Sequence, residues 1–280
     1  MQSLKLGLIG DNIAASRSPR LHRLAGSQNG VAVTYDRLVP REMGEDFETI
    51  LAACPSRGYR GVNVTYPYKE RAARLVTIAD PLVRAIGAVN TVLFEDDGPQ
   101  GFNTDHSGFV AAYRQVRGDQ APGRVLMIGT GGVGRAVAFA LVALGADALR
   151  LVDRDPARAE ALAADLRAAA PGLPVSTHAS AEDAAQGAQG LINCTPLGMV
   201  GNPGTPLPRA AMAGAVWAFD AVYTPVNTEF LTDARAQGLT IISGWELFFF
   251  QGVHAWRHFA GLPLDTSALR ASLLDPGEAA

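Results

Sequence analysis

A glycine-rich segment near the middle of the chain holds the residues best suited to binding a nucleotide. Residues 129–134 read Gly-Thr-Gly-Gly-Val-Gly, between an apolar run that predicts a strand and an apolar run that predicts a helix. In that context the first glycine permits a tight turn, the second lets backbone N–H groups approach a pyrophosphate, and the last allows close helix–strand packing. Asp153 follows at the end of the next predicted strand, where a carboxylate binds ribose hydroxyls. The segment therefore predicts a dinucleotide site, the alternative being a glycine-rich turn without a ligand.

The residues around Asp153 bear on the choice between NAD and NADP. The carboxylates of Asp153 and Asp155 flank Arg154. A carboxylate at the strand end hydrogen-bonds ribose hydroxyls and repels a 2′-phosphate, whereas a guanidinium can pair with that phosphate or stack on adenine. Two negative charges beside one positive charge favour NAD, and NADP stays the alternative.

Four polar clusters lie outside the glycine-rich segment, at residues 16–19, 63–69, 88–91 and 101–105. Each stands at the C-terminal end of a predicted strand or in the loop that follows. In open α/β sheets, ligands bind at that edge. The hydroxyls, amides, one ammonium and one carboxylate of these clusters suit a small polyhydroxylated acid better than an apolar ligand.

Other reactive side chains give weaker signals. His254 and His258 lie one helical turn apart, but no third ligand is evident, so a helix-face pair is favoured over a metal site. Cys194 has no evident His partner, which favours a small buried thiol over a nucleophile. Cys54 and Cys194 are far apart and predict no disulfide framework.

The elements that position these clusters alternate between strand and helix patterns. In the first part of the chain we expect strands at 6–9, 31–38, 61–65 and 88–94, and helices at 18–28, 41–53 and 68–76. Ser18 is the expected N-cap of the first helix, with Pro19 at its first helical position. Such alternation predicts βαβ units and a mainly parallel sheet.

A second α/β series begins after residues 121–123, whose composition is that of a linker. We expect strands at 124–128, 149–153, 175–178, 191–193, 216–221 and 239–243, and helices at 132–144, 156–170 and 245–260. The fold class expected is α/β with two domains. A substrate domain of residues 1–105, completed by 244–280, would join a Rossmann nucleotide-binding domain of residues 106–243.

Composition excludes several classes of protein. The chain has 280 residues with 24 Lys+Arg and 27 Asp+Glu, and this formal charge of −3 argues against nucleic acid or an anionic membrane as the main partner. Hydrophobic residues make up 48% of the chain, enough for a core, yet the run 136–146 falls short of the ~20 residues that span a bilayer. The N-terminus shows no signal-peptide pattern, so a cytoplasmic location is expected.

The polar clusters also carry a family resemblance. The sequence resembles the shikimate dehydrogenase family, including its quinate/shikimate branch, over about residues 5–262. The matching motifs are Ser16-x-Ser18-Pro19-x-x-His22, Gly61-x-Asn63-Val64-Thr65-x-Pro67-x-Lys69, Gly87-Ala88-Val89-Asn90-Thr91, Asn103-Thr104-Asp105-x-x-Gly108, the glycine loop, Asn193-x-Thr195-Pro196-x-Gly198-Met199, Asp220-x-x-Tyr223-x-Pro225-x-x-Thr228, Gly244 and Gln251.

The resemblance implies an oxidoreductase that transfers hydride reversibly between shikimate and 3-dehydroshikimate, with NAD or NADP as cofactor and no metal. Lys69 and Asp105 match the catalytic pair of the family. An ammonium near the C3 oxygen stabilises developing alkoxide charge, and Asp105 would orient Lys69. Without the resemblance, Lys69 reads as a helix lysine and Asp105 as an N-cap.

The resemblance further assigns binding residues. Ser16 and Ser18 match hydroxyls that bind the substrate carboxylate, with Tyr223 close by. Asn63, Thr65, Asn90 and Gln251 match residues that bind the ring hydroxyls. The cofactor-binding residues implied are Gly129, Thr130, Gly131, Gly132, Val133, Gly134, Asp153, Arg154, Arg158, Thr195, Pro196, Met199, Val222, Gly244 and Leu247.

The chain departs from the family pattern at a few positions. Arg23 follows the motif His where many relatives have Asn, and Leu247 replaces a methionine that packs near the nicotinamide. Asp153-Arg154-Asp155 stands where NADP-preferring relatives have Asn-Arg-Thr/Ser. The run 247–250 is bulkier than usual, and core filling is favoured over a reshaped pocket.

Three functions remain open from the sequence. The leading one is a shikimate or quinate/shikimate dehydrogenase of aromatic biosynthesis or of quinate and shikimate catabolism. The second is the same chemistry on another cyclic hydroxy acid, such as an aminoshikimate, and the third is a non-catalytic nucleotide-sensing regulator. Ser18 leans toward shikimate over quinate. The expected partners are small molecules, with neither nucleic acid nor membrane, and the chain is expected as a monomer or homodimer.

Overall fold

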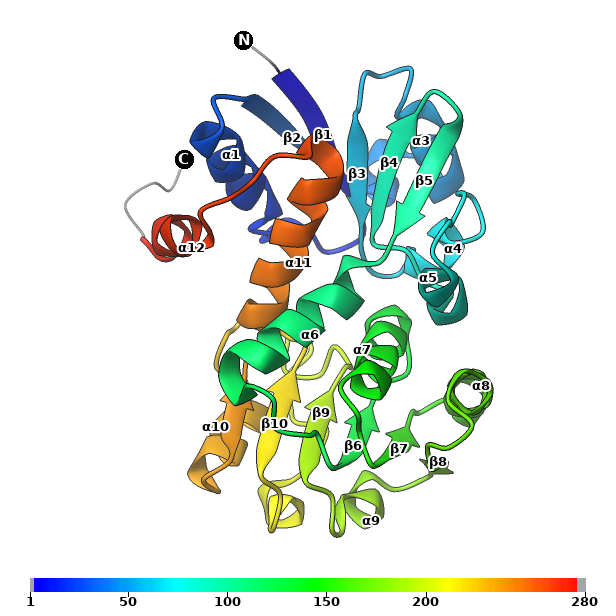
Figure 1. Cartoon of the computed structure of the whole chain (residues 1–280), viewed down its shortest axis with the longest axis vertical. Coiled ribbons are helices and arrows are strands. Elements are labelled where there is room, and N and C mark those ends of the chain that lie inside the picture. Colours follow the sequence, from blue (N-terminus) through cyan, green and yellow to red (C-terminus); the bar gives the residue numbers. More distant parts are fainter. Residues whose placement is uncertain (1–2, 276–280) are drawn as a thin grey trace. The chain divides into compact units, whose positions relative to one another are not determined.

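A computed structural model describes residues 3–275 of the chain (Figure 1). The chain divides into two compact units, unit 1 of residues 1–104 and 251–280 and unit 2 of residues 105–250. The boundaries expected from the sequence lie at 105/106 and 243/244. Helix α11 (Gly244–Ala260) crosses the second boundary of the structure.

Unit 1 is built on a five-stranded sheet of order β2-β1-β3-β4-β5. The strands are β1 (Ser3–Ile9), β2 (Ala32–Leu38), β3 (Gly61–Val64), β4 (Thr91–Glu95) and β5 (Gly98–Phe102). Strand β1 pairs in parallel with β2 and β3, but the β3–β4 and β4–β5 pairs are antiparallel. The expectation of a mainly parallel sheet is therefore wrong for this unit. Only the turn 96–97 joins β4 to β5, and so short a connection closes a hairpin.

Helices cover both faces of this sheet. They are α1 (Ser18–Gln28), α2 (Pro40–Met43), α3 (Phe47–Ala53), α4 (Lys69–Ala72), α5 (Pro81–Ile86) and α12 (Thr266–Leu274). One apolar core gathers side chains of α3, α4 and α5 on the sheet, with Phe47 and Ile50 among them. A second core joins α1 and the end of α11 to the sheet through Trp256 and Phe259.

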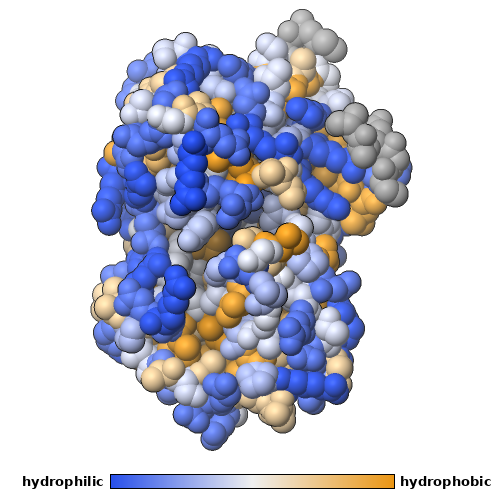
Figure 2. All heavy atoms as spheres, turned by 180° about the vertical axis from the view of Figure 1, so that it is seen from behind, coloured by the Kyte–Doolittle hydropathy of each residue, from blue (hydrophilic) through white to orange (hydrophobic). Residues whose placement is uncertain are grey.

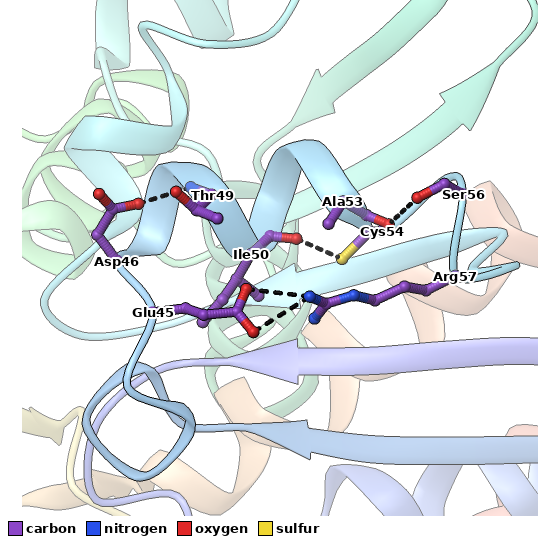
Figure 3. A network of polar contacts seen from close by, with 8 residues as sticks. All are labelled: Glu45, Asp46, Thr49, Ile50, Ala53, Cys54, Ser56 and Arg57. Carbon is purple, nitrogen blue, oxygen red and sulfur yellow. Dashed lines mark hydrogen bonds and ion pairs between the residues drawn. The ribbon is translucent and has the colours of Figure 1, made fainter.

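The prediction of a single helix at 41–53 is wrong, because residues 44–46 separate two helices, α2 and α3. Gly44 adopts the left-handed region, with φ at +66°, which ends α2. Asp46 then caps α3, its Oδ1 accepting a hydrogen bond from the Thr49 amide at 2.7 Å. Figure 3 shows this cap, together with the paired hydrogen bonds from Arg57 to the Glu45 carboxylate. Residues 44–46 thus contain a turn that ends α2 and a cap that starts α3.

Two further boundaries differ from expectation. The N-cap of α1 is Arg17 rather than Ser18, and the Ser18 amide instead donates to Ser16 Oγ at 3.3 Å. The helix expected at 68–76 ends early at Ala72. Beyond it, Thr77 exchanges backbone hydrogen bonds with Pro99 and Gly101 of β5, which draws the chain into an extended path.

Unit 2 contains a six-stranded sheet of order β11-β10-β9-β6-β7-β8, and each strand pair is parallel. The strands are β6 (Arg124–Ile128), β7 (Ala148–Val152), β8 (Val175–His178), β9 (Gly190–Asn193), β10 (Trp217–Asp220) and β11 (Thr240–Ile242). From β6 the strands follow one another outward to β8 on one side, and from β9 they follow one another outward to β11 on the other side. This reversal between β6 and β9 is typical of a doubly wound dinucleotide-binding fold. The expected two-domain α/β fold class is confirmed.

The helices of unit 2 pack on both faces of its sheet. They are α6 (Thr104–Arg117), α7 (Gly132–Ala143), α8 (Pro156–Ala169), α9 (Ala181–Ala185), α10 (Glu229–Ala236) and the short 3₁₀ helix η1 (Arg209–Met212). On one face, α9, α10 and η1 contribute to a single apolar core. From α6, Phe109 contacts Phe219 and Tyr113 contacts Trp217, with ring centroids 4.8 and 5.2 Å apart. The sequence pattern missed α5, α6, α9, α10 and α12.

The surface is mostly polar with scattered apolar side chains, as the face in Figure 2 shows. Tyr66 and Val200 are the most exposed of the large apolar residues, at 67% and 73%. Within residues 3–275, every helix is too short or too polar to cross a lipid bilayer.

Candidate active site

The glycine loop of unit 2 has the backbone geometry that its sequence requires. Gly129 has φ at +97°, and a Cβ there would lie 2.7 Å from the carbonyl carbon of Cys194. A Cβ on Gly134 would overlap the carbonyl oxygen of Gly129. Both positions therefore exclude a side chain: Gly129 lies against the segment that follows β9, and Gly134, in the first turn of α7, lies against the end of β6.

One side of this loop is open. A Cβ on Gly131 would meet one neighbour within 4 Å, the Arg158 guanidinium at 3.6 Å. Helix α7 starts at Gly132, and no side chain caps its first turn. Uncapped N–H groups at a helix N-terminus, beside a cationic side chain, bind a phosphate group well. The residues present thus fit a dinucleotide pyrophosphate.

Asp153 lies half-buried just beyond β7, and its carboxylate is held by three donors. Oδ2 accepts from both the amide and the hydroxyl of Thr130 at 2.7 Å, and Oδ1 accepts from the Asp155 amide at 3.0 Å. Burial would raise the pKa of Asp153, but these hydrogen bonds and the Arg158 charge together lower it below its usual value. Asp153 is therefore ionised at neutral pH.

The neighbours of Asp153 lie at the protein surface. Arg154 and Arg158 are exposed. The Asp155 side chain caps α8 by accepting a hydrogen bond from the Ala157 amide at 3.0 Å. Two carboxylates thus stand where a ribose would meet the strand end.

A buried hydrogen-bond network connects two loops at the C-terminal edge of the unit 2 sheet. Asn193 Nδ2 donates to Asp220 Oδ1 at 3.0 Å, and Asn193 Oδ1 accepts from the Thr195 hydroxyl at 2.7 Å. Asp220 also accepts from the Thr228 hydroxyl at 2.6 Å and from the Val222 amide at 2.9 Å. Burial raises the pKa of Asp220 to about 6, although these donors oppose the shift.

The remaining predicted residues of unit 2 lie in the segments after Asn193 and Asp220 and in the first turn of α11. A Cβ on Gly244 would lie 2.5 Å from the carbonyl oxygen of Val222, so α11 starts in close contact with that backbone. Tyr223 stacks on Phe248, with centroids 5.0 Å apart. Leu247 is buried. Pro196 is exposed and Met199 half-buried, in a turn closed by a backbone hydrogen bond between them at 3.1 Å.

In unit 1 the two predicted serines lie side by side in the loop before α1. Ser16 Oγ donates to Ser18 Oγ at 3.2 Å, and Ser18 is buried. The Arg37 guanidinium, on β2, donates to the carbonyl oxygen of Ser16 at 3.1 Å. An exposed cation thus contacts the backbone of the loop that carries these hydroxyls, which suits an anionic ligand group.

Asn63, Asn90 and Gln251 are brought together by a second network in unit 1. Asn63 Nδ2 donates to Thr91 Oγ1 at 3.1 Å, and Thr91 Oγ1 donates to Asn90 Oδ1 at the same distance. Asn90 Nδ2 donates to Thr104 Oγ1 at 3.0 Å and reaches Gln251 Oε1 at 3.5 Å. Three residues that are distant in sequence thus form one polar group.

Lys69 starts α4 and is 8% exposed. Its carbonyl oxygen accepts a hydrogen bond from the Val89 amide at 2.9 Å, which ties α4 to the segment preceding Asn90. Thr65 is half-buried, and its amide donates to Ile9 at 2.9 Å. Asp105 is buried in the first turn of α6, directly after Thr104.

The weaker candidates have ordinary surroundings. The His258 ring stacks on Phe102 with centroids 3.9 Å apart, and within residues 3–275 no three metal-ligating side chains are grouped to hold an ion. Burial raises the pKa of the Cys54 thiol to about 12, so it is unreactive at neutral pH. Cys194 is half-buried rather than buried as expected.

Sequence reasoning gave no role to several residues of these networks. Thr91, Thr104 and Asp220 stand inside recognised motifs, so their position could have flagged them. Tyr35 carries no such signal, because its β-strand pattern explains a buried aromatic without a function.

Comparison with known proteins identifies the family. The family description "Shikimate dehydrogenase substrate binding domain" matches residues 8–92, and "NADP oxidoreductase coenzyme F420-dependent" matches residues 124–204. The quinate/shikimate dehydrogenase (NAD(+)) of Corynebacterium efficiens is 38% identical over 281 residues, which span 97% of this chain and 98% of that protein. The chain belongs to the shikimate dehydrogenase family.

Other members of the shikimate dehydrogenase family extend this comparison. The shikimate dehydrogenase (NADP(+)) of an Arthrobacter species is 36% identical and covers 98% of this chain and 95% of its own length. The solved quinate dehydrogenase of Corynebacterium glutamicum in complex with NAD has a TM-score of 0.89 at 36% identity, covering 98% of this chain and 99% of its own. The shikimate 5-dehydrogenase of Thermus thermophilus, in complex with NADP(H) and shikimate, has a TM-score of 0.83 at 35% identity, covering 96% and 98%.

Proposed function

We propose that this protein is an NAD-dependent dehydrogenase that interconverts shikimate and 3-dehydroshikimate. The observation that carries the proposal is the polar group of unit 1, in which Asn63, Asn90 and Gln251 converge. Amides held in this way suit several hydroxyls on a small ring better than an apolar ligand. The relatives named shikimate and quinate/shikimate dehydrogenase, which align along nearly the whole chain, support the same substrate class.

NAD is the proposed cofactor, and when bound it accepts or returns the hydride. Ionised Asp153 hydrogen-bonds the adenosine ribose and repels a 2′-phosphate. Asp155 adds a second negative charge. The open side at Gly131 and the uncapped start of α7 receive the pyrophosphate.

The proposed roles of the other residues follow from their chemistry. Lys69 stabilises negative charge on the C3 oxygen and holds a proton there, and Asp105 orients the ammonium and binds a ring hydroxyl. Ser16 and Ser18 donate hydrogen bonds to the substrate carboxylate. Desolvation strengthens these contacts, since Lys69 and Ser18 are both buried.

Quinate is the second candidate substrate. It carries one more hydroxyl at the carbon that bears the carboxylate, so the space beside Ser16 and Ser18 decides. The relative from Corynebacterium efficiens is named for both substrates. We expect shikimate to be preferred, in line with the serine at position 18.

Steady-state kinetics with shikimate and quinate, each against NAD and NADP, test the proposal. We expect the highest kcat/KM for shikimate with NAD. A preference for NADP would overturn the cofactor assignment, and a preference for quinate would overturn the substrate assignment. If the protein binds NAD tightly but turns over neither acid, this result would favour an aminoshikimate-type substrate or a nucleotide-sensing regulator.

A further inference from the structure

We infer that Tyr35 is a positioning residue that orients the Asn63 amide and, through it, the polar group that recognises the substrate ring. This inference rests on the proposed function. It concerns unit 1 alone and a residue outside the family motifs. Tyr35 lies on β2 and is 4% exposed.

Two neighbouring side chains, Tyr35 and His22, hydrogen-bond the Asn63 side chain. The Tyr35 hydroxyl donates to Asn63 Oδ1 at 2.8 Å. His22, on α1, also hydrogen-bonds the Asn63 side chain, and burial lowers the pKa of His22 to about 3, so its ring stays neutral. The His22 ring stacks on Tyr35 with centroids 5.1 Å apart and an angle of 8°. The stack fixes the direction from which the hydroxyl approaches.

The orientation of Asn63 matters because a carboxamide keeps its shape when its oxygen and nitrogen exchange places. With Oδ1 turned to Tyr35, Nδ2 donates to Thr91 Oγ1 at 3.1 Å and to the Asn90 carbonyl oxygen at 3.3 Å. Donation then continues in one direction, from Thr91 to Asn90 and from Asn90 to Gln251. The reversed amide would place its oxygen against the Asn90 carbonyl.

The same network reaches the start of α6. Asn90 Oδ1 accepts from the Thr104 amide at 2.8 Å, and its Nδ2 donates to the Thr104 hydroxyl at 3.0 Å. Thr104 immediately precedes Asp105. The Tyr35 hydroxyl therefore biases which polar atoms of Asn63 and Asn90 remain available to ring hydroxyls.

Tyr35→Phe tests this role, because it keeps the stack on His22 and removes only the hydroxyl. Tyr59→Phe is the matched control: Tyr59 is 7% exposed, and its hydroxyl donates to Asp36 at 2.7 Å in a different apolar core. For Tyr35→Phe we expect the KM for shikimate to rise about 3- to 10-fold, as for the loss of one hydrogen bond. The kcat should stay within about twofold, and Tyr59→Phe should change neither constant.

A second measurement compares the binding of shikimate with that of a deoxyshikimate that lacks one ring hydroxyl. If Tyr35 served only for packing, the Tyr35→Phe substitution would not change the ratio of these two affinities. The wild-type protein should favour shikimate over this analogue in calorimetric titration, and Tyr35→Phe should narrow the preference. If wild type turns over shikimate while Tyr35→Phe matches Tyr59→Phe in KM and in preference, the inference is wrong and the proposed function stands. If wild type acts on neither shikimate nor quinate, both are wrong.

Discussion

At the scale of single residues, burial decides what the polar side chains can do. Lys69, Asn63, Asn90 and Asp105 are all less than 9% exposed, although their residue types prefer water. Such groups are retained in folded proteins when hydrogen bonds or function compensate their desolvation. The amides of Asn63 and Asn90 compensate their own desolvation through the hydrogen bonds of unit 1.

Replacement of Lys69 by Met should lower kcat by a factor of about 10²–10⁴, the range for a positioned acid–base group. Met keeps the apolar stem and removes only the ammonium. NAD affinity, measured by calorimetry, should barely change, because the glycine loop belongs to unit 2. Lys5→Met is the control, since Lys5 interacts with Tyr59 and Arg57 instead. Near-normal kcat in Lys69→Met with both acids would refute the assigned mechanism.

Removal of the Asp153 carboxylate should weaken NAD more than NADP. Asp153→Ala deletes a charged hydrogen bond to the ribose, worth about 1.5–3 kcal/mol, and also a repulsion against the 2′-phosphate. The ratio of kcat/KM for the two cofactors reports this change. Asp155→Ser, in which serine still caps α8, removes only the second negative charge and should shift the ratio in the same direction by a smaller amount. An unchanged ratio in Asp153→Ala would show that another residue selects the cofactor.

At the scale of elements, the βα turn between β6 and α7 combines two different demands on glycine. Gly134 is required by packing, because a Cβ there would meet the backbone of Gly129. Gly131 has φ at −71°, which any residue adopts, and its surroundings are open. Of these two glycines, Gly131 is the one with open space beside its backbone, which a phosphate group needs in order to approach.

The two alanine variants should therefore behave differently. Gly134→Ala should lower the unfolding free energy by about 1–3 kcal/mol, because overpacking displaces α7 from β6. Gly131→Ala should keep wild-type thermal stability but weaken NAD binding about tenfold or more, since the methyl group hinders donation by the backbone N–H groups. Thermal unfolding and calorimetry measure the two effects. Equal destabilisation by both variants would contradict this division of roles.

At the scale of the whole molecule, the two units contain buried groups with opposite responses to pH. His22 in unit 1 has a folded pKa of about 3, below its usual 6.5. As pH falls, His22 therefore binds a proton in the unfolded chain before it does so in the folded protein, and unit 1 loses stability below pH 6.5. Asp220 in unit 2 has a folded pKa of about 6, above its usual 3.8. Its folded form binds the proton first, so unit 2 gains stability as pH falls through 6.

Between pH 7 and pH 5 these two groups should change the unfolding free energies of the two units in opposite directions. His22 should cost unit 1 about 2 kcal/mol, and Asp220 should add about 1 kcal/mol to unit 2. Hydrogen exchange of amides in α1 and in β10, corrected for intrinsic rates, measures each unit. Asp220→Asn should remove the gain in unit 2 and leave unit 1 unchanged. A shift in the same direction in both units would show that other groups dominate.

Local patterns in the sequence determined much of this protein. The alternation of apolar strands and helices predicted the α/β class, and the glycine loop with Asp153 predicted the nucleotide-binding turn, because both depend on neighbours in the chain. Motif spacing also indicated Lys69, Asn63 and Asn90 as site candidates. The spacing did not predict which residues hydrogen-bond to those side chains.

Tertiary structure decided the rest, because it rests on contacts between residues far apart in sequence. The hairpin of β4 and β5 makes half of the strand pairs in unit 1 antiparallel, and the backbone bonds of Thr77 to β5 shorten α4. Tyr35 meets Asn63 only because β2 and β3 both flank β1, and Gln251 reaches Asn90 only after α11 returns to unit 1. Hydrogen bonds of this kind are chosen by the folded geometry, since a buried amide must satisfy its donors and acceptors with whichever groups the fold brings near.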